Sequence, residues 1–337
     1  MSLAPFAGRL PPLTSPQTFR VYLKNDRFLE RLVLPQLDIL LDHTTTFPPH
    51  VYATAPIRIH RVDDLAEADV ELVWDAETKT LVVSPRESPA LSFQSMSNFP
   101  PTFDENSLRQ QYRGKGSPLP PFAEYIYNAA RAFALLKHRN PRDGPRDMRS
   151  EVAIWVARLV QGSDALRRLP SCGMEVITDV DLFMQEKGCE VITQEVYSDG
   201  GHGIVAHNYN PNALYVALVK IPSITLKPEI CYCTQIQGDG GEALLFQRNA
   251  SGEVLGLLRF EVHAGQSFNV DIVLVVFSSE PIDDIDDMIA EKKVWDAMNV
   301  TFVCHSPDDS DTDTIGYGEE EQDITDALVR SARDLKL

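Results

Sequence analysis

The chain has 337 residues, 43% of them hydrophobic and 24% charged, and its formal net charge is −18. This composition is typical of a globular protein, and the length suffices for one large domain or two modest ones. The acidic balance excludes a non-specific binder of nucleic acid or of anionic membranes, because both need a basic surface.

The sequence shows no signal for a membrane or for secretion. No apolar run approaches the roughly 18 residues of a membrane-spanning helix. Residues 1–16 lack the apolar stretch of a secretory signal. The five cysteines are sparse and odd in number, which is not the pattern of a disulfide framework. We therefore expect a soluble protein of the cytoplasm or the nucleus that is not secreted.

The negative charge is concentrated towards the C-terminus. Residues 280–337 contain seventeen acidic and five basic side chains, a net charge of −12. Residues 131–168 have the opposite sign, with nine basic and four acidic side chains. We expect this basic region to contact the acidic segment or a protein partner. The candidate partner-binding residues are Lys137, Arg139, Arg142, Arg146 and Arg149.

The N-terminal part of the chain predicts an arm followed by a helix. Residues 1–18 hold four prolines and are typical of a disordered, Pro-rich arm. Residues 19–43 place apolar side chains at near-helical spacing, which predicts a helix. Pro35 should kink or split this helix, because proline lacks a backbone donor and clashes with the preceding turn.

Strands and a long loop are expected next, within a mixed and mainly helical region that covers residues 19–172. Residues 57–62 alternate between apolar and polar side chains, which predicts a strand. Two apolar runs, 70–74 and 80–83, flank a short polar stretch and predict a β-hairpin. Residues 84–121 hold seven prolines and seven serines, which predicts a long loop.

Two more helices are predicted beside the basic region. Residues 122–139 and 147–169 each place apolar side chains on one stripe. The connector 140–145 has two prolines and a glycine, which is turn chemistry. We therefore expect an αα-hairpin whose exposed face supplies most of the basic side chains.

Residues 173–305 are predicted to be β-rich. Short apolar runs alternate there with Gly, Asn, Pro and Asp clusters, which indicates an antiparallel, sandwich-like sheet structure. The candidate strands are 175–180, 190–197, 204–207, 213–221, 229–237, 242–247, 254–263, 267–277 and 300–304. A helix is expected over 283–298, and residues 306–337 predict an acidic tail with a short helix at 323–335. The expected fold class is thus α+β.

A metal site is one hypothesis for the β-rich half. Asp199, His202 and His207 follow one another within nine residues after a Gly-rich turn. Zinc and iron sites use two imidazoles and a carboxylate that converge on one ion. However, the two histidines are five residues apart, so on a strand they point to opposite faces. We therefore predict no metal and no cofactor.

A thiol site is a second hypothesis. The stretch Cys231-Tyr-Cys233 places both thiols on one face of a predicted strand, and His263 could serve as a base for either thiol. Zinc knuckles and redox pairs usually have two intervening residues, and a second cysteine pair is missing. Two structural cysteines are the simpler interpretation.

Other motif-like stretches do not support a ligand. The acidic run 309–320 imitates the carboxylate spacing of an EF-hand calcium loop, but Thr314 stands where the turn needs glycine. The Gly-rich stretches 200–203 and 238–241 lie between predicted strands, without the Gly-Lys-Ser/Thr ending of a phosphate loop.

Five Ser-Pro dipeptides are candidate phosphorylation sites. All of them fall in segments predicted as loops or arms, which suits proline-directed kinases, and a phosphate adds about −1.5 to −2 charge. The serines are Ser15, Ser84, Ser88, Ser117 and Ser306.

The chain resembles the clampless-type proteins of basidiomycete fungi. The resemblance comes from three stretches: the opening Leu10-Pro-Pro-Leu13, the Leu-rich segment 29–41, and Val70-Glu-Leu-Val-Trp-Asp75 through Pro85. It implies a non-enzymatic intracellular regulator of dikaryon and clamp-cell development in the sexual cycle. It assigns no role to a particular residue.

The leading functional hypothesis is a non-enzymatic, intracellular regulatory protein that works through protein contacts and phosphorylation. Its partner and its oligomeric state are left open. One alternative is a β-sandwich enzyme or ligand-binding module in residues 173–305, with His202, His207 and His263 around a pocket. Another is a lectin-like or membrane-damaging module in the same half.

Overall fold

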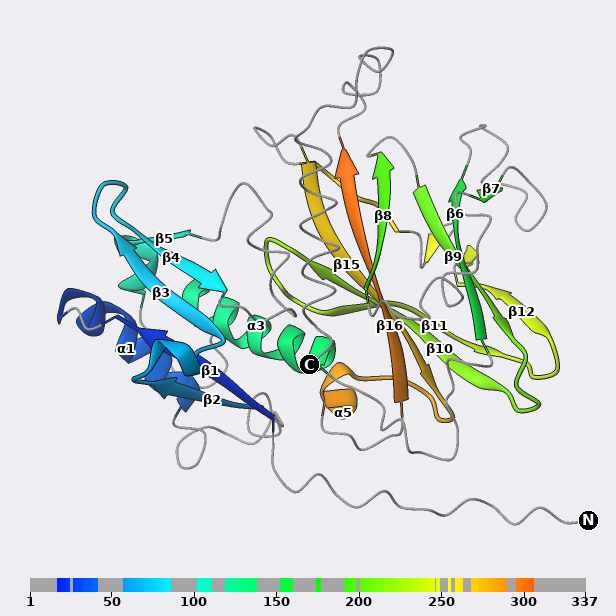
Figure 1. Ribbon diagram of the computed structural model, residues 1–337, viewed down its shortest axis with the longest axis horizontal. Helices are drawn as coiled ribbons and strands as arrows, with labels where there is room; N and C mark the ends of the chain where they lie inside the picture. Colours follow the sequence, from blue (N-terminus) through cyan, green and yellow to red (C-terminus); the bar gives the residue numbers. More distant parts are fainter. Residues whose placement is uncertain are drawn as a thin grey trace, which may run out of the picture.

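The computed structural model (Figure 1) shows three larger β-sheets and a central helix in the described part of the chain. The described residues are 17–24, 27–41, 57–85, 102–110, 119–137, 152–159, 174–176, 191–197, 201–245, 247–248, 254–255, 258–262, 268–289 and 295–305.

The first sheet is built from the N-terminal strands, in the order β2-β1-β3-β4-β5. These strands are β1 (Gln17–Leu23), β2 (Ile57–Val62), β3 (Val70–Asp75), β4 (Thr80–Pro85) and β5 (Thr102–Asp104). Strand β1 pairs in parallel with both β2 and β3. Strands β3, β4 and β5 pair antiparallel, which confirms the predicted hairpin around residues 76–79.

Helices cover one face of this N-terminal sheet. The helical elements of this region are α1 (Arg27–Leu41), η1 (Leu65–Glu67), α2 (Glu105–Leu108) and α3 (Pro121–Lys137). Phe19, Val21 and Leu23 alternate with more exposed neighbours and join one buried cluster with residues of α1, α2 and α3. Phe19 meets Phe133 of α3 edge to face, with 5.4 Å between the ring centroids.

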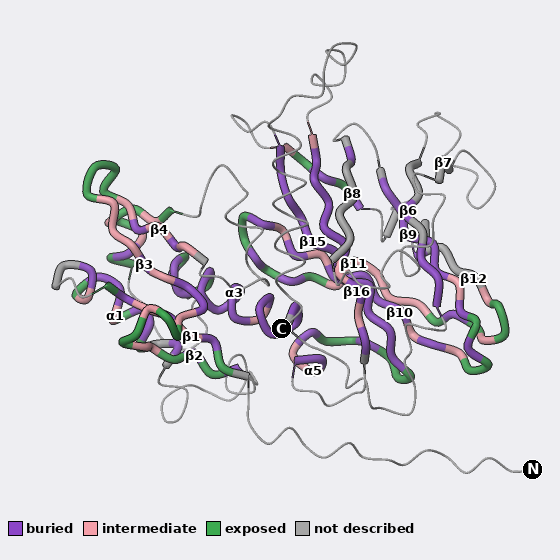
Figure 2. The backbone as a smooth tube through the Cα atoms, viewed as in Figure 1, coloured by how far each residue is buried: buried purple, intermediate pink, exposed green. Residues whose placement is uncertain are grey.

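Helix α3 is buried on nearly its whole circumference (Figure 2). Such a helix must have packing partners on every side. In α3 the described side chains that keep contact with water are Pro121, Glu124 and Arg131. The cluster around α3 includes the N-terminal sheet on one side and residues of β10 and β15 on the other. The helix therefore connects the two halves of the protein through one hydrophobic core.

The second half is a β-sandwich of a five-stranded and a four-stranded sheet, ordered β11-β10-β15-β16-β8 and β12-β9-β6-β7. A two-stranded ribbon, β13-β14, is also present. The strands are β6 (Val152–Leu159), β7 (Met174–Val176), β8 (Val191–Tyr197), β9 (Gly201–Asn208), β10 (Leu214–Pro222), β11 (Glu229–Ile236), β12 (Gly241–Leu244), β13 (Gln247–Arg248), β14 (Val254–Leu255), β15 (Phe268–Ser278) and β16 (Trp295–His305).

The five-stranded sheet lies between two cores. Every residue of β15 is buried, as expected for a strand that is covered on both faces. Val270 and Leu274 belong to the core around α3, whereas Val273 and Val275 belong to the core inside the sandwich. The α+β class and the largely antiparallel sandwich agree with the prediction, although β16 and β8 pair in parallel.

The predicted helix over residues 19–43 is only partly correct. Residues 19–23 form β1, and the helix α1 begins at Arg27. The buried side chains of β1 repeat every second residue, which is the period of a strand. Two parallel neighbours supply its hydrogen bonds. Gln17 and Thr18 also belong to β1, so the predicted arm 1–18 extended too far, and residues 1–16 lie outside the described part.

The second helix of the predicted αα-hairpin is wrong. Residues 152–159 within the predicted helix 147–169 form β6, which pairs antiparallel with β9 along its whole length. Val152, Ile154 and Val156 are buried, and they face the sandwich core at the period of a strand. β-branched side chains favour this pleated setting, and the available partner strand decides the conformation. Helix α3, the first helix of the pair, is confirmed.

Two other segments differ from prediction. In the predicted loop 84–121, residues 102–108 form β5 and the short helix α2, and residues 84–85 end β4. In the predicted helix 283–298, the described helical residues are the five of α5 (Ile285–Ile289), and residues 290–294 lie outside the described part. The chain from Trp295 onward forms β16, because β15 offers an antiparallel partner over eleven residue pairs.

The described helices are all too short or too polar to cross a membrane. The predicted acidic tail 306–337 and its short helix lie outside the described residues.

Candidate functional site

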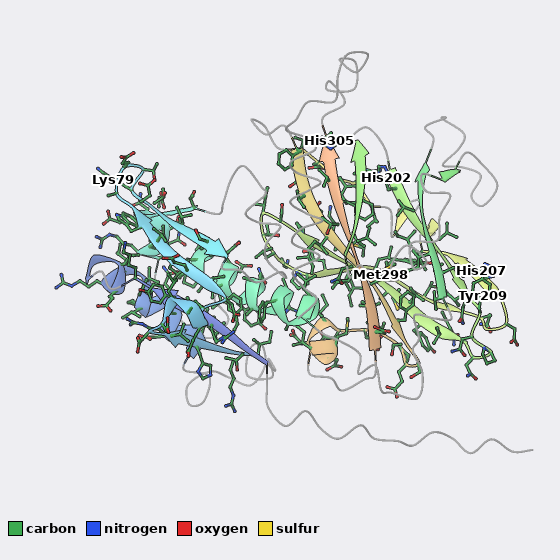
Figure 3. All side chains as sticks on the ribbon, in the orientation of Figure 1. Lys79, His202, His207, Tyr209, Met298 and His305 are labelled. Atoms are coloured by element: carbon green, nitrogen blue, oxygen red, sulfur yellow. The ribbon has the colours of Figure 1, made fainter. Side chains whose placement is uncertain are left out.

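The two candidate histidines lie at opposite ends of β9 (Figure 3). His202 is 1% exposed and packs against Phe260, with 5.7 Å between the ring centroids. Its backbone N–H and C=O each form a 2.9 Å hydrogen bond with Leu258. His207 is half-buried and lies on the other face of the strand, since the two histidines are five positions apart. The two imidazoles therefore cannot bind the same metal ion.

A metal centre has no support in the described ranges. No group of three His, Cys, Asp or Glu side chains comes close enough there to hold an ion. Asp199, the third predicted ligand, lies outside these ranges. His202 is instead a core residue between β9 and the segment around Phe260.

The structure separates the two cysteines of β11. The register between β10 and β11 shifts at Leu218/Val219, and Cys231 is the extra residue of a β-bulge. Cys233 packs against the core around α3, whereas Cys231 packs against the core inside the sandwich. The expectation that both thiols share one face is wrong, because a bulge reverses the side-chain alternation. His263, the proposed base, lies outside the described residues.

The surroundings of Cys231 do not activate its thiol. Burial is the largest influence and raises the pKa of Cys231 above its usual value. A backbone hydrogen bond from Lys220 and the positive charge of that side chain act in the opposite direction. The thiolate, which is the nucleophile of cysteine enzymes, is therefore disfavoured at neutral pH.

A partly buried ion pair lies near this bulge, with Asp271 buried and Lys220 21% exposed. The Lys220 ammonium is 3.0 Å from a carboxylate oxygen of Asp271 and donates a 2.7 Å hydrogen bond to the backbone carbonyl of Arg259. It also lies 5.0 Å from the ring centroid of Phe260. The backbone N–H of Ser223 donates to the other oxygen of Asp271 at 3.3 Å. Both charged groups are therefore paired with other groups of the protein, as in an ion pair that has a structural role.

The predicted basic surface lies almost wholly outside the described part of the chain. Lys137 is the last residue of α3. The other four candidates, Arg139, Arg142, Arg146 and Arg149, lie outside the described residues. Within the predicted helix 147–169, residues 152–159 form a strand, and the rest of that range is outside the described residues. The described basic residue nearest to them on α3, Arg131, forms an ion pair with Asp286.

Of the five Ser-Pro sites, the structure describes one. Ser84 lies in β4 and pairs with Glu71 of β3, so it is not in the loop where it was expected. A kinase that needs an extended substrate would have to pull this residue out of the sheet. The other four sites, Ser15, Ser88, Ser117 and Ser306, lie outside the described residues.

A rigid turn at the end of β9 is the most distinctive surface feature. The buried side chain of Asn208 donates hydrogen bonds to the carbonyls of Asn212, at 2.8 Å, and Gln237, at 3.1 Å. Its oxygen accepts a 3.0 Å hydrogen bond from the backbone N–H of Asn210. The side chain of Asn210 in turn accepts from the backbone N–H of Asn212 at 2.9 Å. These side-chain bonds hold residues 208–212 in one conformation.

The turn between β11 and β12 packs directly against this Asn turn. The backbone N–H of Asp239 donates to Asn210 O, and that of Gly240 donates to Asn208 O, both at 2.8 Å. A Cβ atom at Gly238 would lie 2.5 Å from the carbonyl group of Pro211, so only glycine fits there. Asp239 and Gly240 have positive φ angles of 56° and 91°, typical of a tight hairpin turn.

The two turns present an aromatic pair. The rings of His207 and Tyr209 are stacked, with centroids 4.6 Å apart and an interplanar angle of 9°. Tyr209 is 57% exposed, the larger value of the two exposed large hydrophobic residues in the described part, the other being Ile224 at 40%. We call residues 207–212 and 237–241 the Tyr209 platform.

The Tyr209 platform combines a hydrogen-bonded backbone with an exposed aromatic ring. The buried amide of Asn208 fixes the backbone, and the Tyr209 ring is exposed beside polar side chains such as Gln237 and Asp239. Tyrosine on a rigid support offers a large contact area at small entropic cost. The sequence signals for this platform are Asn208-Tyr-Asn-Pro-Asn212 and Gly238-Asp-Gly-Gly241. In the sequence both stretches indicate only turns between strands, because nothing local shows that they contact each other.

Comparison with known proteins adds no assignment. No protein-family model matches the chain, and no curated protein matches it. Among solved structures, the chain is similar to a chain of the Salmonella enterica SafA pilin in complex with the SafB chaperone. The identity is 8%, the TM-score is 0.23, and the match covers 36% of this chain and 53% of that chain. The chain thus spans about half the length of that structure, and a similarity this low carries no argument.

Proposed function

We propose that the protein is a non-enzymatic protein-binding protein whose contact surface is centred on Tyr209. The observation that carries the proposal is an exposed tyrosine on a backbone that is already rigid. Loops have to lose conformational freedom when they bind, and a turn held by internal hydrogen bonds loses little. Exposed tyrosines on such supports are common at the centres of protein interfaces.

The ring stacking on the Tyr209 platform supports the same function. The His207 ring stacks on one face of the Tyr209 ring, and this contact restricts the orientation of the tyrosine side chain. The exposed part of Tyr209 then remains for a partner. Gly240 stands beside this pair, since a Cβ there would lie 3.6 Å from Nε2 of His207. Because Gly240 has no side chain, it leaves room there for a side chain of the partner.

The resemblance to clampless-type proteins extends the proposal to the biological role. On that basis the protein is an intracellular regulator of dikaryon and clamp-cell formation, in the cytoplasm or the nucleus. Phosphorylation at the Ser-Pro sites would then control its contacts. The acidic segment after residue 305 is the second candidate contact region, because its charge suits a basic partner.

The main proposal is tested by measuring the amount of partner protein that the immobilised, tagged chain binds. Tagged full-length protein is compared with Tyr209→Ala and with Ile224→Ala, the matched control at the other exposed large hydrophobic residue. We expect Tyr209→Ala to reduce capture of specific partners at least about tenfold, as for an interface hot spot. Ile224→Ala should leave capture unchanged. Equal capture by all three proteins would refute a contact surface at Tyr209.

A truncation distinguishes the contribution of the acidic tail to partner binding from that of the Tyr209 platform. A chain that ends at Ser306 lacks the acidic segment but keeps all described residues. If the tail is a contact region, this truncation should weaken capture in a manner that depends on salt, because exposed charges are screened. Capture that is unchanged by the truncation at every salt concentration would remove the tail from the proposal.

A further inference from the structure

A carboxylate lies beside the tyrosine on the Tyr209 platform. The backbone N–H of Asp239 donates to the carbonyl of Asn210, and that of Gly240 donates to the carbonyl of Asn208, both at 2.8 Å. These two hydrogen bonds fall on either side of Tyr209 along its turn. The side chains of Tyr209 and Asp239 are both exposed. A partner that covers the tyrosine therefore also reaches the carboxylate.

The carboxylate of Asp239 is not used within the part of the chain that the structure describes. No ion pair and no side-chain hydrogen bond involves it there. Aspartates of other turns differ in this respect. The carboxylate of Asp64 accepts from the backbone N–H of Ala66 at 2.9 Å, and that of Asp75 accepts from the Thr78 hydroxyl at 2.8 Å. Those carboxylates hold their own turns, whereas the charge of Asp239 is available to a partner.

Covering this carboxylate without a hydrogen-bond donor would be costly. A charged group that loses its water needs an opposite charge and hydrogen bonds in return. The described platform residues, 207–212 and 237–241, include no lysine and no arginine that could provide them. The partner therefore has to provide them. The net charge of the whole chain, −18, also favours the approach of a basic partner.

An arginine side chain matches both parts of this surface. Its planar guanidinium stacks on aromatic rings, and it donates two parallel hydrogen bonds to a carboxylate. The ammonium group of lysine is a compact charge without this planar fork, so it cannot make both contacts equally well. Arginine and tyrosine are also among the residues that carry most of the binding energy at protein interfaces.

We propose that the Tyr209 platform binds an arginine side chain of its partner. The guanidinium lies against the exposed part of the Tyr209 ring and donates hydrogen bonds to the carboxylate of Asp239. This inference rests on the proposed function, because it names the chemistry of the partner at the same site, after the end of β9 (Figure 3). An acidic or purely apolar contact would leave the carboxylate unpaired.

Titration with short peptides tests the arginine site directly. The isotope-labelled full chain is titrated with the blocked peptide Gly-Ala-Arg-Ala-Gly, and NMR follows the amide signals of Tyr209, Asp239 and Gly240. The comparison peptides carry lysine or citrulline, which has the shape of arginine without its charge. We expect the arginine peptide to bind at least about tenfold more tightly than the citrulline peptide, and more tightly than the lysine peptide. Signals of the platform are separate from those of the acidic segment after residue 305, which attracts any basic peptide.

Asp239→Asn is the sharpest variant for this test. Asparagine keeps the size of the side chain and adopts the positive φ of this position readily, so that the change removes only the charge. We expect Asp239→Asn and Tyr209→Ala each to weaken binding of the arginine peptide at least about tenfold. Asp38→Asn is the matched control, since it makes the same change at an exposed position of α1. It should leave the titration unchanged, and unchanged amide signals in the rest of each variant show that it is folded.

Three results would overturn the arginine site. They are an arginine peptide that does not shift the platform signals, a citrulline or lysine peptide that binds as tightly, and an Asp239→Asn variant that binds like the wild type. Measurements of partner binding separate this inference from the proposed function. If Tyr209→Ala reduces partner binding and Asp239→Asn does not, the contact at Tyr209 is supported and the arginine site is wrong. If the peptide results hold but Tyr209→Ala leaves partner binding unchanged, the arginine site is supported and the proposed protein contact is wrong.

Discussion

Arg131 of α3 and Asp286 of α5 form an ion pair that connects the two halves of the protein. Both the Nε and the terminal guanidinium nitrogen of Arg131 lie 2.9 Å from one oxygen of Asp286. The arginine side chain is only 15% exposed, and its guanidinium lies 5.6 Å from the ring centroid of Tyr127. The pair thus fixes the position of α3 against the connection between β15 and β16.

Breaking this pair should lower the free energy of unfolding. We expect Arg131→Met or Asp286→Ala to cost about 1–2 kcal/mol, between the values for exposed and for fully buried pairs. The double variant should cost less than the sum of the single ones, because its second change removes an already lone charge. Urea denaturation measures all three values.

The exposed pair between Arg109 and Glu105 provides the control. These residues are four apart on the surface, and Arg109→Met should change stability by no more than about 0.5 kcal/mol. An equal cost for Arg131→Met and Arg109→Met would contradict a structural role for the buried pair.

The shared core around α3 predicts that both halves unfold together. Ile126 is fully buried in this core, and Ile126→Ala should lower the free energy of unfolding by about 2–5 kcal/mol. The decrease in the free energy of unfolding should be the same when it is measured at amides of β1 and of β15, which belong to different halves. Hydrogen exchange with mass spectrometry, followed in increasing urea, measures each segment separately. Loss of protection confined to β1 would show that the halves are independent.

The Tyr209 platform should be sensitive to glycine replacement at one position. Gly238→Ala would bring a Cβ to 2.5 Å from the backbone of Pro211, and we expect it to cost about 1–3 kcal/mol as the two turns move apart. It should also weaken any binding at Tyr209. Asp239→Gly is the control, since Asp239 already has a positive φ that glycine adopts without strain. If Gly238→Ala left the free energy of unfolding unchanged, the close contact between Gly238 and Pro211 would be contradicted.

The cysteine environment predicts slow alkylation of Cys231. Burial raises its pKa, so at a given pH less thiolate is present than for an ordinary cysteine. The alkylation rate should therefore rise only at a pH above the usual thiol range, and peptide mapping by mass spectrometry measures it. Lys220→Met removes a positive charge that lowers this pKa, so the midpoint should move further upward.

The same cysteines should not form a disulfide with each other under mild oxidation. Cys231 and Cys233 pack into different cores, so the two sulfur atoms point away from each other. A 231–233 disulfide in the folded protein would contradict the β-bulge.

Several elements could be predicted because their signals are local. The β3–β4 hairpin follows from two apolar runs around Asp75, whose side chain caps the turn. Helix α3 follows from its apolar periodicity, although the sequence did not indicate that it is buried on nearly every side. The strands from β8 to β12 and β15 lie close to their predicted positions, because Gly and Asn turns separate them.

The secondary-structure predictions are wrong where a strand that is distant in the sequence determines the conformation. Residues 19–23 and 152–159 have apolar spacings that fit a helix or a strand. They are strands because β2, β3 and β9 lie beside them, and the backbone N–H and C=O groups of these neighbours need hydrogen-bond partners. The bulge at Cys231 is equally invisible in the sequence, since it depends on the register with β10. It also decides which core each cysteine enters.

The sequence by itself determined the acidic balance, the α+β class and most of the strand positions in the second half, because composition, turn residues and apolar periodicity are local properties. Only the tertiary structure decided that His202 and His207 are apart and that Cys231 and Cys233 enter different cores. It also brought the Asn208–Asn212 turn against the Gly238–Gly241 turn to present Tyr209. The physical reason is that pairing register and packing between distant segments set which side chains meet, and neither is encoded in any short stretch of the chain.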